Sequence, residues 1–224
     1  MNEIEQQFTY FRVGSASDAF INTFLQRGKI LFFYKNDIIY SDREKVDGIF
    51  LVLDGIIECY YVENEKKRVF AYMGEKTLLG MIGTISQRHT STRCYTDCVV
   101  AFLEKTQLYQ MDRMFLVELL NLQVEKAHWF IHTENKIALD NIKMRLLRFL
   151  YEASHMNLTM NREDLPTKLC YSRQEIACVI STSREYVTSL LKEIQKEVRM
   201  QVNRNEIILY PCDISRAISK TKKM

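Results

Sequence analysis

The sequence has few of the two residues that most often interrupt regular structure. It contains 7 glycines and 2 prolines among 224 residues, where average usage would give about 16 and about 11. This scarcity excludes collagen-like, low-complexity and Pro/Gly-rich linker chains. No glycine follows Gly83. A turn-rich N-terminal part is therefore expected to precede a turn-poor C-terminal part.

No targeting or membrane segment is apparent. The N-terminal stretch MNEIEQQF has neither a basic region nor an apolar one, and no apolar run approaches the ~20 residues of a membrane span. Six cysteines without a signal peptide favour reduced thiols over a disulfide framework. We therefore expect a cytoplasmic protein.

The net charge of +3 is divided unevenly along the chain. Residues 141–224 carry +6, whereas residues 1–140 carry −3. A basic C-terminal part beside an acidic N-terminal part suits nucleic-acid binding by one end of the chain. An ordinary basic domain is the alternative.

Short β runs fill the N-terminal half and predict a β-barrel or jelly roll of about eight strands. The strongest local signal is Asp54-Gly55 between two apolar runs. It predicts a two-residue type I′ hairpin, because both central residues then need a positive φ. A further turn is expected at 64–67. If Cys94 and Cys98 lay on one strand, they would be ~13 Å apart and unable to form a disulfide without rearrangement. The expected strands span residues 29–34, 38–40, 49–53, 56–62, 68–73, 77–79, 90–96 and 98–103.

The period changes to that of a helix after Thr106. A short amphipathic piece at 106–111 precedes a long helix that ends near Leu139. This helix has two apolar stripes. One is a seam with coiled-coil spacing that can pair with another subunit. The second can pack on the barrel and includes Leu119, Leu122, Trp129 and Phe130. A core helix within a single domain is the alternative. The seam consists of Val117, Leu120, Val124, Ala127, Ile131 and Ala138.

Asp140-Asn141 predicts a break between that helix and a following one, which ends near His155. Residues 156–167 are polar and contain Pro166, so a loop or linker is expected there.

Two short helices joined by a three-residue turn are expected in residues 172–194, the pattern of a helix-turn-helix. Ser172 and Glu175 have the spacing of a capping box, and Ser183 is the expected N-cap of the second helix. The N-terminal end of such a second helix enters the major groove of DNA. This end exposes Arg184, Glu185, Thr188 and Ser189.

A hairpin wing is expected after the second helix, from strands at 199–202 and 206–210. Arg204 in its turn is placed to meet a phosphate. Asp213 is expected to cap a short terminal helix.

This order of elements resembles the CRP/FNR superfamily of transcription regulators. The resemblance is carried by residues 172–177, by Ser183-Arg184-Glu185 with Val187, by Leu139-Asp140 at the family's hinge, and by the barrel segment at 50–55. It implies an α+β fold with a sensory β-barrel or jelly roll at 1–110, a dimerisation helix at 111–140 and a winged helix-turn-helix at 141–224.

The resemblance implies a homodimer that reads an inverted repeat in double-stranded DNA, with RNA polymerase as a partner. Arg184 would donate to guanine O6 and N7, and Glu185 would accept from cytosine N4. Arg173 and Gln174 match phosphate contacts of the family, and Ser183 is a further DNA-binding residue that the resemblance implies. Ser189 stands where a second arginine is often found. Activation is the implied outcome, with repression left open.

The barrel departs from the cyclic-AMP-binding members. These have a Gly-Glu pair followed by an Arg-Ser or Arg-Thr pair, whereas this chain has Gly80-Met81 and Arg88-His89. Methionine cannot accept hydrogen bonds from ribose hydroxyls as a carboxylate does, so a small organic effector is expected instead. A weak similarity to halorespiration regulators, which sense chlorinated aromatics, points the same way. The effector candidates, between barrel and long helix, are Tyr72, Gly80, Met81, Arg88, Lys126 and Trp129.

No metal or cofactor is expected. An FNR-type iron–sulfur cluster needs several cysteines, mostly near the N-terminus, but the first cysteine is Cys59. His128 and His132 have metal-ligand spacing, although a solvated or core role is the simpler interpretation. Two alternatives remain: an effector-independent or partner-controlled regulator of this fold, and an enzyme or cyclic-nucleotide-gated subunit. The sequence contains no Gly-rich phosphate loop or nucleophile–base motif that would support the enzyme alternative.

Overall fold

The computed structural model describes residues 10–12, 14–80, 87–156, 163–204 and 206–221. The chain divides into two compact units. The first runs from Arg12 to His132, and the second comprises the chain from Thr133 onward together with a short segment that includes Tyr10 and Phe11. The boundary falls inside the long helix α3 (Arg113–Leu139). The three-part division into 1–110, 111–140 and 141–224 remains a prediction.

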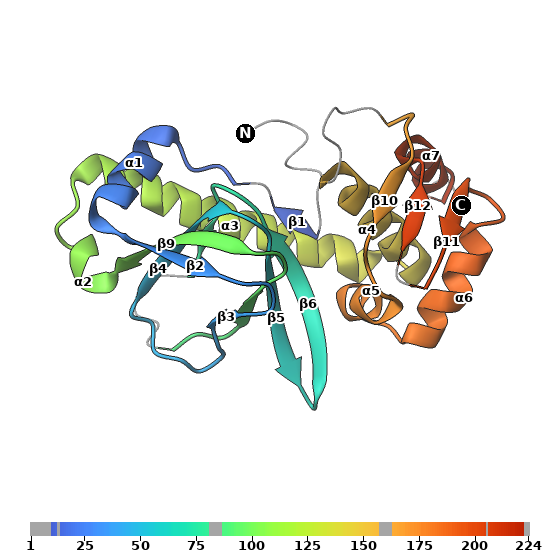
Figure 1. Cartoon of the computed structure of the whole chain (residues 1–224), viewed down its shortest axis with the longest axis horizontal. Helices are drawn as coiled ribbons and strands as arrows, with labels where there is room; N and C mark the ends of the chain where they lie inside the picture. The colour runs from blue at the N-terminus through green and yellow to red at the C-terminus, as the bar shows by residue number, and fades with distance from the viewer. Residues whose placement is uncertain (1–9, 13, 81–86, 157–162, 205, 222–224) are drawn as a thin grey trace. The chain divides into compact units, whose positions relative to one another are not determined.

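Two sheets form the centre of the first unit, as Figure 1 shows. One has the strand order β1-β6-β5-β8-β3 and the other the order β2-β9-β4-β7. The expected jelly-roll-like α+β fold is confirmed. The strands are β1 (Phe11–Arg12), β2 (Lys29–Phe33), β3 (Ile38–Tyr40), β4 (Gly48–Asp54), β5 (Ile57–Glu63), β6 (Lys66–Met73), β7 (Leu78–Leu79), β8 (Ser91–Cys94) and β9 (Cys98–Glu104).

The first unit has two hydrophobic clusters. One includes inward-facing residues of both sheets, such as Val52, Ile57 and Val100, together with Trp129 of α3. The other joins the four-stranded sheet to α3, to α2 (Lys105–Leu108) and to α1 (Asp18–Arg27), a helix that the sequence pattern did not predict. There the ring of Phe20 stacks on that of Phe115, with centroids 4.4 Å apart. These contacts fix one face of α3 against the sheet.

The type I′ hairpin predicted at Asp54-Gly55 is wrong. The strands on either side, β4 and β5, lie in different sheets, so the segment crosses from one sheet to the other. Gly55 has a φ of +91°, but Asp54 does not have a positive φ. The turn with two positive φ values is Asn64-Glu65, at 49° and 63°. It joins β5 to β6, which form the long hairpin at the bottom of Figure 1.

Cys94 and Cys98 do not share a strand. Cys94 ends β8 and Cys98 begins β9, and both side chains are buried. Their thiols hydrogen-bond to each other, which raises the pKa of Cys94 and lowers that of Cys98. The condition for a ~13 Å separation, a single shared strand, is therefore not met, because the chain turns between the two residues.

The second unit contains four helices and a small sheet among its described residues. After the break at Asp140 and Asn141, as predicted, α4 (Ile142–Met156) begins. The sheet has the order β10-β12-β11, and β10 lies at the end of the stretch predicted to be a loop. The elements are β10 (Thr167–Leu169), α5 (Arg173–Ile180), α6 (Arg184–Ile194), β11 (Met200–Val202), β12 (Ile207–Leu209) and α7 (Pro211–Thr221).

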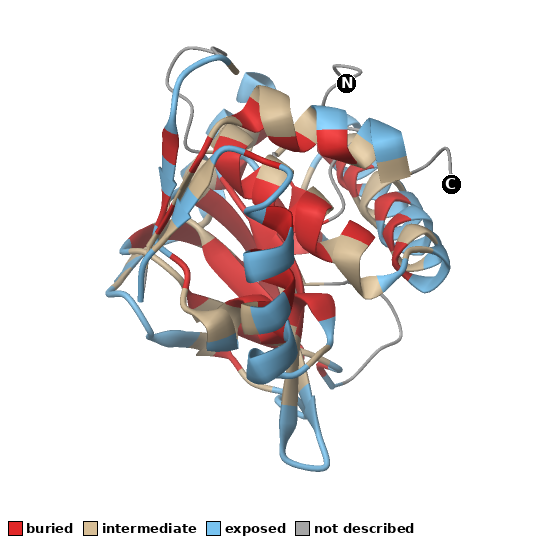
Figure 2. Cartoon of the chain, turned by 90° about the vertical axis from the view of Figure 1, so that its right-hand side faces the viewer, coloured by how far each residue is buried: buried red, intermediate tan, exposed pale blue. Residues whose placement is uncertain are grey.

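The burial pattern follows the predicted amphipathic faces. Figure 2 colours buried residues red, and these gather along the sheets and the inner faces of the helices. The tip of the hairpin that projects at the bottom is exposed. In the second unit, Leu146, Leu147 and Leu150 of α4 and Val187 of α6 are fully buried. Each unit therefore has buried apolar residues of its own, which position the candidate site within that unit.

Candidate nucleic-acid interface and ligand cavity

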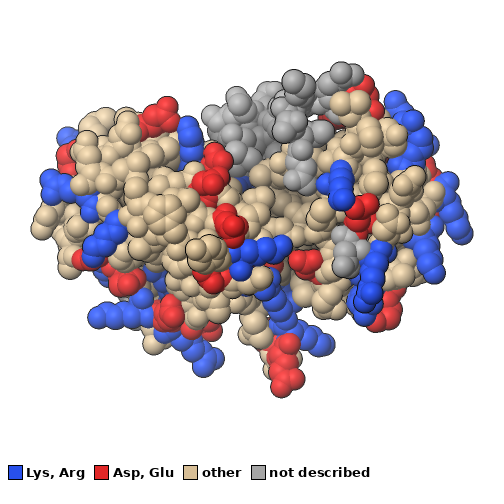
Figure 3. Space-filling view, in the orientation of Figure 1, with Lys and Arg blue, Asp and Glu red and all other residues tan. Residues whose placement is uncertain are grey.

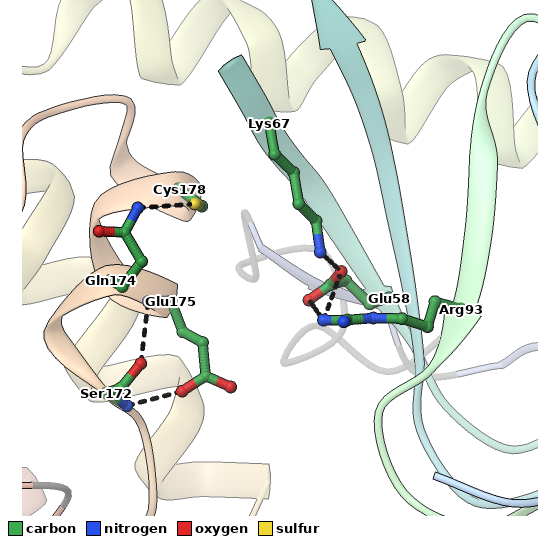
Figure 4. Close-up of polar contacts among 7 residues, drawn as sticks. All are labelled: Glu58, Lys67, Arg93, Ser172, Gln174, Glu175 and Cys178. Atoms are coloured by element: carbon green, nitrogen blue, oxygen red, sulfur yellow. Dashed lines mark hydrogen bonds and ion pairs between the residues drawn. The ribbon is translucent and has the colours of Figure 1, made fainter. Parts of the chain in front are cut away.

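The first helix of the helix-turn-helix, α5, begins at a complete capping box. The hydroxyl of Ser172 accepts a hydrogen bond from the amide of Glu175 at 3.2 Å, and the Glu175 carboxylate accepts one from the amide of Ser172 at 2.7 Å (Figure 4). This confirms the predicted start of the helix. A capping box satisfies two amides that would otherwise have no acceptor, so the backbone at the start of α5 is rigidly held.

The turn between the two helices includes one residue in an unfavourable backbone conformation. Ser181 has φ 57° and ψ 57°, in the left-handed region. Residues other than glycine are sterically destabilised in this region, because their Cβ atom approaches the following carbonyl oxygen. Ser183 then caps α6, and its hydroxyl accepts a hydrogen bond from the amide of Tyr186 at 3.1 Å.

Replacing Ser181 by glycine is expected to stabilise the protein by about 0.5–1 kcal/mol. The relief of left-handed strain exceeds the extra entropy that glycine loses on folding. Thermal unfolding measures the change. Ser183→Ala is the matched variant and should destabilise by about 1 kcal/mol, because it removes an N-cap. A lower melting temperature for Ser181→Gly would contradict this account of the turn.

The second helix, α6, buries one face and leaves its N-terminal end exposed. Val187, Leu190, Leu191 and Ile194 face the core. Thr188 is half-buried, and its hydroxyl donates to the backbone carbonyl of Arg184 at 3.0 Å. The exposed residues of this end include the predicted Arg184, Glu185 and Ser189, as well as Tyr186.

Tyr186 is a surface residue that the sequence analysis missed. Its side chain is 47% exposed, one position before the buried Val187. The helical period could have predicted its exposure, because neighbouring residues on a helix are about 100° apart and Tyr186 therefore lies away from the face that buries Val187. An exposed tyrosine there adds an aromatic face and a hydroxyl to the candidate interface.

The predicted wing is present. Strands β11 and β12 pair from Met200↔Leu209 to Val202↔Ile207, and Arg204 in their turn is exposed. Figure 3 shows basic and acidic side chains mixed on the visible face of this unit, at the right of the view. The terminal helix α7 begins at Pro211 rather than after Asp213. Asp213 lies in its first turn, where it accepts a hydrogen bond from Arg199 at 2.6 Å.

The long helix α3 has two apolar faces, of which one is buried and the other is exposed. Phe115, Leu119, Leu122 and Trp129 are buried against the sheets. On the other face Ala127 and Ala138 are exposed, and the exposed fractions of the larger side chains lie between 46% and 63%. These larger side chains, which belong to the predicted seam, are Val117, Leu120, Val124 and Ile131. Phe130, assigned to the packed stripe, is 39% exposed.

A cavity of about 380 Å³ lies in the first unit, between the sheets and α3. Four predicted effector residues line it: Gly80, Arg88, Lys126 and Trp129. Tyr72 does not line it, because neighbours on a strand point to opposite faces: Met73 lines the cavity, while the Tyr72 ring packs on Tyr95 with centroids 5.3 Å apart. Met81 lies outside the described residues. Lining residues that the sequence analysis missed include Tyr40, Cys59, Phe70 and Gln123.

Comparisons with known proteins agree with this geometry. Residues 30–113 match the model of the cyclic nucleotide-binding domain. The chain is 23% identical over 186 residues to the CRP-like protein Clp of Xanthomonas campestris (strain B100), covering 77% of this chain and 80% of Clp. It is 20% identical over 201 residues to the cAMP-activated global transcriptional regulator CRP of Escherichia coli O157:H7, covering 87% and 95%. The chain is a homologue of the CRP-like regulators.

Solved structures show the same fold. The c-di-GMP-responsive global regulator CLP of Xanthomonas campestris superposes with a TM-score of 0.73 at 20% identity, covering 87% of this chain and 99% of that one. A CRP/FNR-family regulator from Thermus thermophilus gives 0.72 at 19% identity, covering 85% and 98%. The chain thus has the CRP/FNR fold, and its homologues are transcription regulators rather than enzymes. Across the described residues, no helix is both long and apolar enough to cross a membrane.

Two cationic side chains line the otherwise mainly apolar cavity, and the first is largely committed to the barrel. Arg88 is 5% exposed, and its guanidinium donates to the Gly48 carbonyl at 3.1 Å and to the Asp47 carboxylate at 3.3 Å. It also lies over the ring of Tyr40, 4.0 Å from the centroid. Gly80 has a φ of +83°, and a Cβ there would lie 2.8 Å from the Arg88 guanidinium. Arg88 therefore holds the cavity wall together.

Lys126, the second cation, extends from α3 to the opposite wall. Its ammonium group donates to the backbone carbonyl of Gly80 and lies 3.5 Å from that of Leu78. Burial lowers the pKa of Lys126 to about 8, and the charges of Arg12 and Arg88 add to this effect. Proton loss from this amine therefore falls within an accessible pH range.

The low pKa of Lys126 predicts how stability changes with pH. Between pH 8 and about 10.5, the ordinary pKa of lysine, the unfolded chain binds more protons at this site than the folded one, so this site's contribution to stability rises with pH. Relative to Lys126→Met, the wild type should therefore gain melting temperature from pH 7.5 to pH 10. Lys66→Met, at an exposed lysine, is the matched control. A difference between wild type and Lys126→Met that does not change with pH would contradict the assignment.

A second charged cluster lies on the five-stranded sheet. The Glu58 carboxylate is 1% exposed and accepts hydrogen bonds from Lys67 on β6 and from Arg93 on β8, the latter at 3.2 Å to each oxygen (Figure 4). This cluster ties three strands together. Among the described residues, no group of three or more His, Cys, Asp and Glu side chains could hold a metal ion.

Proposed function

We propose that the chain is a homodimeric transcription regulator that reads an inverted repeat in double-stranded DNA. The observation that carries this proposal is the exposed N-terminal end of α6, which follows a capped turn and stands on a fully buried face. In a helix-turn-helix, this end of the second helix contacts base edges in the major groove. The homology to CRP-like regulators supports the same function.

Base recognition is assigned to the residues exposed on α6. Arg184 donates two hydrogen bonds to guanine, and Glu185 accepts one from cytosine. The hydroxyl of Thr188 is bonded within the helix, so its methyl group is left for contact with thymine. Ser189 provides a short polar contact. Gln174 contacts the phosphate backbone, although its amide also donates to the Cys178 thiol at 3.6 Å.

Dimerisation is assigned to the exposed seam of α3. Apolar side chains at a 3-4 spacing on one face of a long helix form the interface of a two-stranded coiled coil. Two such subunits carry two recognition helices, which suit half-sites about 34 Å apart. The proposed organisation is a sensory part at 1–110, a dimerisation helix at 111–140 and a DNA-binding part at 141–224. RNA polymerase is the proposed partner at the promoter.

Control by a small organic effector other than a cyclic nucleotide is assigned to the cavity in the first unit. Apolar side chains such as Phe70, Met73 and Trp129 suit an apolar body. Lys126 suits one acidic group on it. Met81 cannot take the ribose-binding role of a carboxylate, and Arg88 already bonds to the barrel. An effector-independent or partner-controlled regulator of the same fold is the alternative.

Selection from a pool of random duplexes, followed by gel shifts, tests the proposed function. The expected result is enrichment of an inverted repeat that is bound by two subunits. Failure to enrich any sequence would overturn the proposal. Thermal shift against a panel of small organic acids, with cAMP and c-di-GMP included, tests the effector. An acid that raises the melting temperature supports the assignment, whereas a shift with only a cyclic nucleotide contradicts it.

A further inference from the structure

We propose that Arg173 is a positioning residue that holds the wing in place for DNA, rather than a phosphate contact itself. This inference rests on the proposed function and deepens it. Arg173 is the first residue of α5, and its guanidinium donates a hydrogen bond to the backbone carbonyl of Arg204. Arg204 lies 31 positions further along the chain, in the turn of the wing.

The two ends of this contact differ in how firmly they are held. At the Arg173 end, the Ser172–Glu175 capping box fixes the backbone on either side of the arginine. A rigid helix start is therefore the anchor. At the other end, β11 and β12 pair only as far as Val202↔Ile207, so the exposed turn at Arg204 extends beyond the three-stranded sheet. The hydrogen bond therefore restrains the wing more than it restrains the helix.

Other contacts secure the base of the wing. The amide of Asn203 donates to the Glu206 carbonyl at 2.8 Å, and the Asn203 side chain donates to the Glu206 carboxylate at 3.3 Å. Lys168 on β10 forms an ion pair with the same carboxylate. These contacts close the hairpin but do not join it to the helix-turn-helix. The Gln195 side chain at the end of α6 donates to the Met200 carbonyl of β11 at 3.4 Å, and the bond from Arg173 to Arg204 joins the turn of the wing to the start of α5.

The consequence for DNA binding is a preorganised pair of surfaces. A wing that is fixed before binding loses less conformational freedom when it meets a phosphate, which favours affinity. In this arrangement the charge of Arg204 contacts the backbone, while Arg173 acts through Arg204. The energetic effects of the two residues should therefore depend on each other.

A double-mutant cycle on the full-length protein separates the two roles. Arg173→Met should weaken binding to the selected duplex on the order of tenfold in the wild-type background. In the Arg204→Met background, the same substitution should have less than about a twofold effect. Lys220→Met, at an exposed basic residue of α7, is the control and should show no coupling to Arg204.

The salt dependence of binding shows whether Arg173 contacts a phosphate directly. A direct phosphate contact at Arg173 would lower the slope of log affinity against log salt by about 0.9, whether or not Arg204 is present. Equal losses in both backgrounds, with that additional fall in slope, would overturn the proposal. Thermal unfolding of each variant identifies those that fail to fold, and Arg173→Ala, which also removes the donor, replaces Arg173→Met in that case.

Hydrogen exchange without DNA makes the test independent of the proposed function. Arg173→Met should accelerate exchange of the Asn203 amide in the free protein, because the wing opens more often when it is released from α5. A phosphate-contacting arginine would leave this rate unchanged, and that result overturns the proposal. If the protein binds no duplex at all, the proposed function fails, while the exchange rate still decides whether Arg173 holds the wing.

Discussion

Replacing Leu120 with glutamate is expected to convert the proposed dimer into a monomer and to weaken binding to the inverted repeat at least about 100-fold. Leu120 lies in the exposed seam of α3 with 63% of its side chain accessible. In a two-stranded coiled coil this position meets its symmetry mate. Two carboxylates would then be buried beside each other without partners, which costs several kcal/mol.

Sedimentation equilibrium and gel shifts measure the two effects of Leu120→Glu. Met114→Glu is the matched control, because Met114 is 77% exposed on the same helix but lies outside the seam. It should leave both the dimer and the DNA affinity unchanged. Persistence of the dimer in Leu120→Glu would show that the subunits meet elsewhere, and the exposed stripe would then need another explanation.

Replacing Arg184 with alanine is expected to cost about 1–3 kcal/mol of DNA-binding free energy and to relax specificity at one base position. The physical reason is the loss of two hydrogen bonds to guanine O6 and N7, which no other base pair presents in the same way. Arg184 is exposed at the first position of α6, so its removal leaves the packing of the helix intact.

Binding to a set of duplexes, each with one half-site base changed, measures this loss. The wild type should discriminate strongly at one position where Arg184→Ala does not. Arg216→Ala, at an exposed arginine of α7 that bonds to Asp213, is the matched control. If Arg184→Ala discriminates among all half-site bases as the wild type does, Arg184 does not read a base.

Features set by short-range interactions could be predicted from the sequence. The capping box at Ser172 and the helix break at Asp140 depend on residues only a few positions apart. The two faces of α3 also follow from one period over a single element. For this reason the helix-turn-helix, the long helix and the exposed end of α6 were all correctly predicted.

Features set by distant pairing could not be predicted. Asp54-Gly55 has the composition of a type I′ turn, but β4 pairs with β9 rather than with β5, so the local preference is overridden. The same limit applies to Cys94 and Cys98, which the chain reversal brings into contact. The same limit applies to Tyr72, which was predicted to line the cavity. The sequence can predict that a strand residue is buried, but not which face of the sheet its side chain lies on.

The candidate ligand cavity was predicted only in part for a related reason. The sequence indicated Arg88 and Lys126 as cations near an effector, and the structure places both in the cavity wall. It could not indicate that the Arg88 guanidinium is bonded to Asp47 and Gly48. Acceptors on other strands decide whether a cation faces a ligand or supports the protein.

We expect two copies of α6 to read two half-sites at a fixed separation. Gel shifts with the selected inverted repeat test this expectation most directly when about 5 bp are inserted between the half-sites, half of a 10–10.5 bp helical turn. The affinity should fall to the level of a single half-site, because the second recognition helix then faces the wrong side of the duplex. Affinity that is unchanged by the insertion would contradict it.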